Sequence, residues 1–258
     1  MRPVDVNAWI GEYPWHGQPR WTARDLAAEM ANADTDELWV SHLAGAFGRD
    51  PAAGNVELYA AANADSRIRP VPTVDPSVAD WADALDVAVR QKAPAVRYDP
   101  VLRGIDPVGN EVFHLLGACA TRAMPLMMAV RLEDLRQRDP DDPAADLPPF
   151  AIRQLIRSNP AARLIITHAD RDTIEQVHFG STPSEARRIL WDISWIWGPP
   201  EDHLELLFRT VGIERFAFGT GMPLRLAENS VAKLDLLQLD ADARHRICAR
   251  NVAEFVAG

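Results

Sequence analysis

Cysteine is scarce in this chain, which has two cysteines, Cys119 and Cys248, among its 258 residues. They lie far apart, and each falls in an apolar, helix-like stretch. Isolated thiols of this kind are typical of small buried side chains in a protein kept in a reducing compartment. The sequence therefore predicts two buried cysteines and no disulfide.

Long hydrophobic runs are also absent. No apolar run reaches the roughly 18 residues that a membrane span requires. The first five residues (MRPVD) lack the positively charged start and apolar core of a secretory signal. We therefore expect a cytoplasmic protein that has no membrane partner.

Positive charge is in short supply as well, because 37 acidic residues face 27 basic ones and the formal net charge is -10. Such a chain repels phosphate backbones, so nucleic acid is not expected as a partner. Apolar residues make up 47% and charged residues 25% of the chain. These fractions are typical of a folded globular protein and exclude a disordered or fibrous one.

The sequence does contain a regular alternation of short apolar, β-rich runs with longer helical patterns, which indicates parallel βα units. The strand candidates cover residues 3–9, 36–42, 68–74, 94–98, 125–131, 163–168, 189–195 and 215–219. Eight units in this length give about 32 residues per unit, as a (β/α)8 TIM barrel requires. We predict an α/β fold of this class, with residues 1–258 forming one domain.

Helical patterns occupy residues 79–90, 111–122, 150–158, 202–211 and 240–256. Thr22 with Asp25 predicts a capped helix start, and so does the segment 181–185 (STPSE). The stretch 139–149, rich in proline and aspartate, is expected to be a long loop. Residues 43–50 (LAGAFGRD) are expected to form a small-residue loop over the mouth of the barrel.

Chemistry in such a barrel resides where the strands end at their carboxyl side, so the residues at these positions are the candidates for a site. In chain order they are Asp5, Asn7, Trp9, Ser41, His42, Thr73, Asp75, Arg97, Asp99, Arg131, Glu133, Asp134, His168, Asp170, Asp192, Ser194, Trp195, Gly219, Thr220 and Gly221.

Several segments together resemble the TIM-barrel amidohydrolases of the "amidohydrolase 2" type. The resemblance rests on residues 4–11 (VDVNAWIG), 95–97 (AVR), 125–129 (PLMMA), 167–169 (THA) and 215–223 (RFAFGTGMP). It also includes a closing helix, residues 247–256, which carries Asn251. The resemblance implies a hydrolase or lyase that acts on a small, carboxylated or cyclic organic substrate.

In that family a divalent metal is held by two histidines on the first strand, one on the fifth, one on the sixth and an aspartate after the eighth. The matching positions here hold Asn7, Trp9, Ala129, His168 and Gly221. A catalytic zinc needs about three strong protein ligands, and only His168 is one. We therefore expect no metal and no other cofactor, and the family's lactonases imply that such a barrel can work without a metal.

His168 is the predicted acid or base, because it ends the sixth strand at the rim where a barrel presents reactive groups. Alternation places it on the strand face of Leu164 and Ile166. Its partner carboxylate could be Asp170, Asp192 or Asp5. We favour Asp192 because, if the tryptophan face of residues 191–197 points outward, Asp192 points into the barrel.

The other predicted site residues would bind substrate. Asn7 would donate to an oxyanion, and Arg97 with Arg131 would clamp a carboxylate unless Arg131 belongs to an internal ion-pair network. Trp9 would fill volume that a metal otherwise takes, and Trp195 would form an aromatic wall or pack on the helices. His42 would contact the substrate or, in a further alternative, join His168 in an unfamiliar metal site.

Two functions therefore stay open at the sequence level. The first is a metal-independent hydrolase or lyase that uses His168. The second is a catalytically inactive barrel that binds a ligand or serves as partner subunit to an active relative, either as a homo-oligomer or as a hetero-oligomer. A pocket at His168 would favour the first, and a mouth filled by Trp9 and Trp15 would favour the second.

Overall fold

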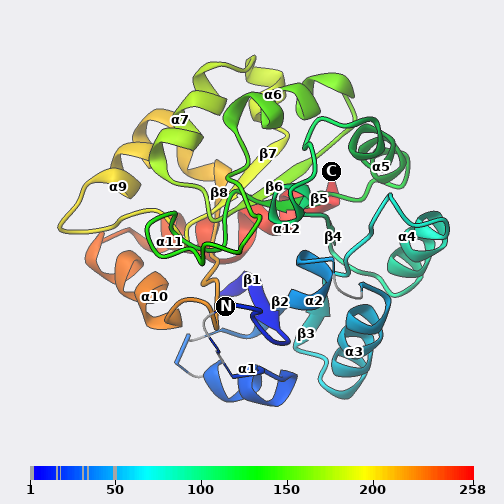
Figure 1. Ribbon diagram of the computed structural model, residues 1–258. Helices are drawn as coiled ribbons and strands as arrows, with labels where there is room; N and C mark the ends of the chain where they lie inside the picture. The colour runs from blue at the N-terminus through cyan, green and yellow to red at the C-terminus, as the bar shows by residue number, and fades with distance from the viewer. Residues whose placement is uncertain (1–2, 16, 18, 31, 34, 49–50) are drawn as a thin grey trace.

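The computed structural model describes residues 3–15, 17, 19–30, 32–33, 35–48 and 51–258, and in it eight parallel strands lie at the centre with the helices around them (Figure 1). The strands are β1 (Val4–Ile10), β2 (Glu37–His42), β3 (Ile68–Pro70), β4 (Val96–Arg97), β5 (Leu126–Ala129), β6 (Leu164–Thr167), β7 (Ile189–Asp192) and β8 (Phe216–Ala217). Each falls where the sequence predicts a strand. The predicted (β/α)8 class is confirmed, although most strands are shorter than their apolar runs.

Hydrogen bonds connect the strands into a ring. One run of paired strands is β1-β2-β3, and the other is β4-β5-β6-β7-β8. The two runs meet through a parallel bridge between Thr73 and Arg97 on one side. On the other side the Val6 amide donates to the Phe218 carbonyl at 3.0 Å. The carboxyl ends of all eight strands therefore meet at one mouth.

Most helices lie around the ring, whereas the last one crosses behind its centre in Figure 1. In chain order they are α1 (Ala23–Glu29), α2 (Leu43–Ala46), α3 (Pro51–Ala64), α4 (Trp81–Arg90), α5 (Asn110–Thr121), α6 (Pro149–Ser158), α7 (Arg171–Phe179), α8 (Pro183–Ala186), α9 (His203–Leu207), α10 (Ala227–Leu236), α11 (Ala241–His245) and α12 (Asn251–Ala257). The predicted capping boxes are present at Thr22 and Thr182. The sequence patterns did not indicate α3, α7 or α10; α3 is rich in alanine and lacks a clear apolar stripe.

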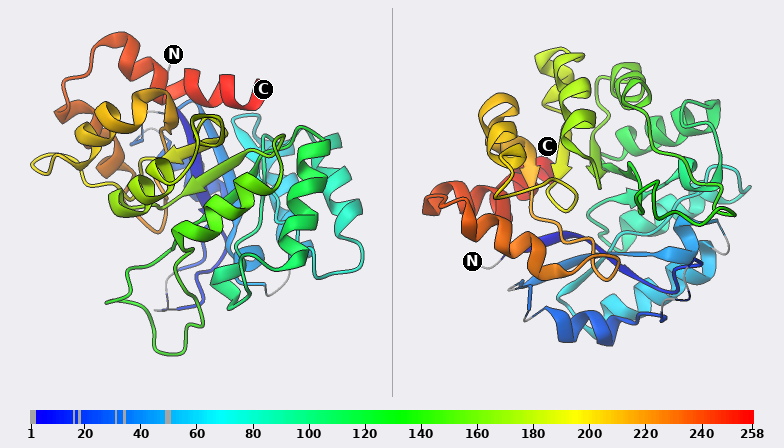
Figure 2. Two further views of the ribbon diagram at one scale, coloured as in Figure 1. Left: turned by 90° about the horizontal axis from the view of Figure 1, so that it is seen from above. Right: turned by 60° about the vertical axis from the view of Figure 1, so that its left-hand side comes forward.

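Two predicted loops have different outcomes. The segment between β5 and α6 has no helix over the proline-rich stretch and projects from the body as the long green loop in Figure 2, as predicted. The loop predicted at residues 43–50 is wrong in part, because α2 occupies its first half. Arg49 and Asp50 lie outside the described residues.

Side-chain alternation sends the two faces of a strand to different hydrophobic clusters, as β5, β6 and β7 show. Ile165, Met127 and Leu190 pack inside the ring with residues of other strands, whereas Leu164 and Ile166 join the layer that includes α6 and α7. Cys119 and Cys248 are buried and form no disulfide within the described part of the chain, as predicted. No helix among the described residues is long and apolar enough to cross a membrane.

Asn251 begins α12 and ties the end of the chain to the barrel. Its side-chain amide donates to the carbonyls of Ile213 and Phe216, both at 2.8 Å, and the residue is buried. Because these carbonyls precede and begin β8, the amide holds the last strand in position. Loss of the amide removes a donor from the buried Phe216 carbonyl, whereas the half-buried Ile213 carbonyl still accepts from the Phe216 backbone amide.

We expect Asn251→Ala to lower the free energy of unfolding by about 1 to 3 kcal/mol, which is the cost of one unsatisfied buried acceptor, here the Phe216 carbonyl. Urea unfolding followed by circular dichroism measures this change. Asn63→Ala, at an exposed position of α3, is the matched control and should change the free energy of unfolding by about 0.5 kcal/mol or less. Equal stabilities of the two variants would contradict the role assigned to Asn251.

Candidate functional site

His168 lies at the end of β6 in an unusual backbone conformation, with φ of 56°. Alternation alone would leave its ring on the face of Leu164 and Ile166, which packs against the helices. In the structure the ring instead lies against Asn7 of β1, with 3.2 Å between Asn7 Nδ2 and His168 Nε2. A left-handed conformation at a residue other than glycine carries a cost of about 1 to 2 kcal/mol, which the surrounding contacts must offset.

Asn7 is the residue that joins the site together. Its Nδ2 donates to Asp192 Oδ2 at 2.8 Å and also faces His168 Nε2, while its Oδ1 accepts from Arg97 at 3.3 Å. An amide NH2 has two hydrogens, one for each of these acceptors. His168 Nε2 therefore acts as an acceptor, and the ring proton resides on Nδ1. That Nδ1 is buried and has no hydrogen-bond partner among the described residues.

Asp192, the predicted partner carboxylate, acts on His168 by a route that differs from the prediction. Its Oδ1 accepts from the backbone N–H of His168 at 2.9 Å, and its Oδ2 accepts from Asn7. It therefore holds the His168 backbone and the Asn7 amide rather than the imidazole itself. Burial raises the pKa of Asp192, and hydrogen bonds from the His168 backbone amide and from Asn7, together with the charge of Lys233, oppose that rise.

The other two carboxylates considered for this role have different partners. Asp5 accepts from the backbone amides of Asn7 and Thr220 and from the Thr220 hydroxyl at 2.6 Å. Burial raises the pKa of Asp5 to about 7 even so. These bonds hold β1 where its register against β2 shifts, between Asp5 and Ala8. Asp170 caps α7 and forms an ion pair with Arg131.

Arg97 places a positive charge inside the barrel, completely buried. Its guanidinium donates to Ser41 Oγ at 2.8 Å and to Asn7, and it lies 4.1 Å from the centre of the Trp9 ring. Asp99 is 3.6 Å away. Trp9 is thus a face on which the guanidinium rests, and Arg97 is held by protein groups rather than presented to solvent.

Arg131 does not form the predicted clamp with Arg97. It pairs with Asp146 at 2.7 Å and with Asp170 at 2.6 Å, which is the alternative of an internal ion-pair network. The clamp prediction also missed Arg225, which lies 3.5 Å over the Trp195 ring and forms no ion pair within the described residues. The sequence signal that could have identified Arg225 is its position just after the segment 215–223, which resembles the end of the family's eighth strand.

His42 has a structural role in this geometry. Its Nδ1 accepts from the Ala44 amide at the start of α2, and its Nε2 lies 3.2 Å from Glu57. Gly11 and Gly54 leave the space that its ring fills, since a Cβ at Gly11 would come within 2.8 Å of it. Neither the substrate contact nor the shared metal site with His168 predicted for His42 is supported by these contacts.

The residues at the family's five metal-ligand positions do not fit a metal. A Cβ at Gly221 would lie 2.8 Å from His168 Nε2, so the imidazole occupies the space of the missing aspartate. A bound cation needs ligand atoms that direct lone pairs toward it. At His168 Nε2 the neighbouring group is instead the N–H donor of Asn7. Across the described residues no group of three or more His, Cys, Asp or Glu side chains could hold a metal ion.

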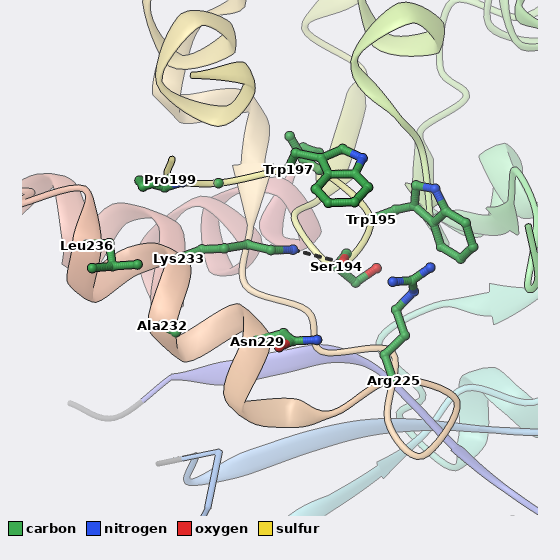
Figure 3. A pocket seen from close by; sticks show the side chains of 11 residues that line it. Ser194, Trp195, Trp197, Pro199, Arg225, Asn229, Ala232, Lys233 and Leu236 are labelled. Carbon is green, nitrogen blue, oxygen red and sulfur yellow. Dashed lines mark hydrogen bonds between the residues drawn. The ribbon is translucent and has the colours of Figure 1, made fainter. Parts of the chain in front are cut away.

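Trp195 covers the imidazole. Its ring meets that of His168 edge to face at 5.9 Å, and the guanidinium of Arg225 stacks on the same indole (Figure 3). The predicted shared face of the tryptophans fails because β7 ends at Asp192 and the chain then turns. Trp191 is buried, Trp195 lies in the mouth and Trp197 is 63% exposed.

The electrostatic environment keeps His168 neutral. Burial is the main cause that lowers its pKa well below the usual value, and the charges of Arg225, Arg97 and Arg131 add to it. The exposed fraction is 0% for each of the central residues Asn7, Trp9, Arg97, His168 and Asp192. The basic lone pair of this neutral imidazole is on Nε2, so a reactant can give it a proton by taking the place of the Asn7 amide.

This lowered pKa makes the stability depend on pH. Below pH 6.5 the unfolded chain protonates its histidine while folded His168 stays neutral, so acid favours unfolding. We expect the unfolding free energy of the wild type, relative to His168→Gln, to fall by up to about 1.4 kcal/mol per pH unit below that value. Urea unfolding at several pH values measures it. His114→Gln, exposed on α5, should follow the wild type, and a difference that does not vary with pH would refute the lowered pKa.

Comparison with known proteins gives a family. The Amidohydrolase family model matches residues 23–257. No curated protein matches the chain. Among solved structures, a probable 2-pyrone-4,6-dicarboxylic acid hydrolase from Acinetobacter baumannii with bound citric acid is 11% identical, with a TM-score of 0.71 and all of both chains covered.

Two decarboxylases are similarly close in fold. The 5-carboxyvanillate decarboxylase of Sphingomonas paucimobilis is 14% identical, with 99% of both chains covered and a TM-score of 0.72. The 2,6-dihydroxybenzoate decarboxylase of Rhizobium is 12% identical, with 99% of this chain and 98% of that one covered and a TM-score of 0.75. At these sequence identities the similarity to solved structures shows the fold alone. The match of the family model over residues 23–257 shows the family, and the chain therefore belongs to the amidohydrolase family.

Proposed function

We propose that this protein is a hydrolase or lyase that acts on a small carboxylated organic substrate without a bound metal, with His168 as the group that transfers the proton. The observation that carries the proposal is the state of His168: a neutral, buried imidazole at a strand end, near three arginines and with its Nδ1 unpaired in the described structure. The names of the similar hydrolase and decarboxylases support a carboxylated substrate.

Each neighbour of His168 has a defined part in this proposal. Asn7 fixes the tautomer by donating to Nε2, and Asp192 fixes Asn7 and the His168 backbone. Arg97 supplies a positive charge that is independent of pH near neutrality, in a place with little water. Negative charge that develops on a substrate is stabilised there more strongly than in solvent.

Arg225 is the group we propose for holding a substrate carboxylate. Unlike Arg131, it has no acidic partner in the described structure, and it sits over Trp195, the ring that covers His168. A bidentate guanidinium–carboxylate contact would draw Arg225 away from that ring. Access to His168 then requires Trp195 to move, because the imidazole is fully buried in the present arrangement.

The second candidate function is a catalytically inactive barrel that binds a ligand or serves as a partner subunit. This function is favoured by the full burial of Asn7, Trp9, Arg97, His168 and Asp192. Protein side chains already fill the mouth of the barrel, so no substrate is needed to fill it. The Nδ1 of His168 and the Nε1 of Trp9, both unpaired in the described structure, argue against it, since buried donors without acceptors are costly in a purely structural core.

A screen of small lactones, amides and carboxylic acids decides between these functions. We expect turnover of at least one compound, and a loss of about 100-fold or more in His168→Gln, as removal of a general acid or base produces. His114→Gln is the matched control and should keep the wild-type rate. Equal rates in wild type and His168→Gln would remove His168 from the mechanism, and no turnover of any compound would favour the inactive barrel.

The metal-independence of the proposed reaction has its own test. Protein purified without chelator should carry far less than one equivalent of zinc, manganese or iron, and chelator should leave both its melting temperature and any turnover unchanged, because His168 has no second strong ligand at the family's metal positions. Elemental analysis measures the metal content. A stoichiometric metal that disappears in His168→Ala would overturn the proposal.

We also propose that residues 1–258 form one domain, that the protein works in the cytoplasm, and that it has no nucleic-acid or membrane partner. A homo-oligomer, or a hetero-oligomer with an active relative, is compatible with either function. The measured mass in solution, with and without such a relative, distinguishes the two assemblies.

A further inference from the structure

A cavity of about 340 Å³ lies beside the barrel mouth, between the loop that follows β7 and helix α10 (Figure 3). We call it the tryptophan pocket. Its polar and aromatic lining comes from Ser194, Trp195, Trp197, Arg225, Asn229 and Lys233. The buried residues on the barrel axis do not line it, and of the six side chains named only Trp195 and Arg225 have a part in the function proposed above.

The charges in this pocket are positive. Arg225 and Lys233 line it, and no acidic residue of the described chain does. Within the same residues, Arg225 has no ion-pair partner and its Nε has no acceptor. Lys233 donates to the carbonyls of Ile193 and Ser194, at 3.0 and 2.9 Å, so its hydrogen bonds go to neutral groups. A half-buried guanidinium without a counter-charge is a good partner for an anion.

The walls of the pocket are flat and apolar. Trp195 and Trp197 both contribute to the lining, and Leu236 and Pro199 complete it. Trp197 is 63% and Leu236 is 59% exposed, which is unusual for large apolar side chains that line one pocket. Indole faces favour planar ligands, and a ligand that covers them removes apolar area from water.

We propose that the tryptophan pocket binds a flat organic anion, with the carboxylate on Arg225 beside Lys233 and the ring against Trp195 and Trp197. This site deepens the proposed function and rests on it for the carboxylate contact, because Arg225 is the group proposed there to hold a substrate carboxylate. Binding in the pocket itself needs no proton transfer at His168. The site also touches that function, since Arg225 rests on Trp195 and Trp195 covers His168. An anion that binds Arg225 therefore changes the contacts of Trp195, the side chain that covers the His168 ring.

Titration of the intact protein with 2-naphthoate, followed by calorimetry and ligand-observed NMR, tests this site. The neutral 2-naphthamide has the same shape and should bind about tenfold or more weakly, since one charge-assisted contact corresponds to at least that factor. Arg225→Gln should weaken 2-naphthoate by a similar factor and leave 2-naphthamide unchanged. Trp197→Ala should weaken both compounds.

Two control variants separate this site from nonspecific attraction of an anion and from the reaction at His168. Arg209→Gln, at an exposed arginine paired with Glu205, should bind 2-naphthoate as the wild type does. His168→Gln should also keep that binding even where it abolishes turnover, so failure of the proposed reaction and failure of this site are distinguishable. Equal affinity for the acid and the amide, equal affinity in Arg225→Gln, or no binding of 2-naphthoate at about 10 mM would each overturn the proposal.

Discussion

The side-chain amide of Asn7 is the contact on which the whole site depends. It joins β1 to β4, β6 and β7 at once, through Arg97, His168 and Asp192. Both of its hydrogens and its oxygen are engaged, inside a barrel where an unmatched polar atom is costly. A network of this kind specifies one arrangement of the four strands, because any shift of one strand leaves a buried donor or acceptor unpaired.

The same network explains how His168 keeps a strained backbone. A φ of 56° is unfavourable for histidine, yet it turns the ring away from the helices and toward Asn7. Asp192 offsets part of that cost by accepting from the His168 backbone amide. Strain supported from two sides in this way is typical of a functional position rather than of ordinary packing.

Sequence reasoning was effective for features that depend on periodicity and weak for those that depend on how a strand ends. Alternation and length predicted all eight strands, and the positions of His168, Asp192 and Asn7 at strand ends followed from the fold class. The inward turn of His168 could not be predicted, because it arises from a single positive φ. Trp195 was ambiguous for a related reason: β7 stops at Asp192, and alternation has no meaning after that residue.

The departures from the family's metal positions are connected to one another by space and charge. Removing the side chain at Gly221 leaves room that the His168 ring takes, within 2.8 Å of where a Cβ would be. Trp9 gives Arg97 a ring to lie on, and Asn7 gives it an oxygen. The barrel thus keeps a positive charge near its axis, but on a guanidinium that is covalently part of the chain. A metal and this guanidinium would repel each other at such short range, so the two arrangements are alternatives. Restoring one ligand alone would therefore not restore the family's site, because Arg97 and the imidazole already occupy it.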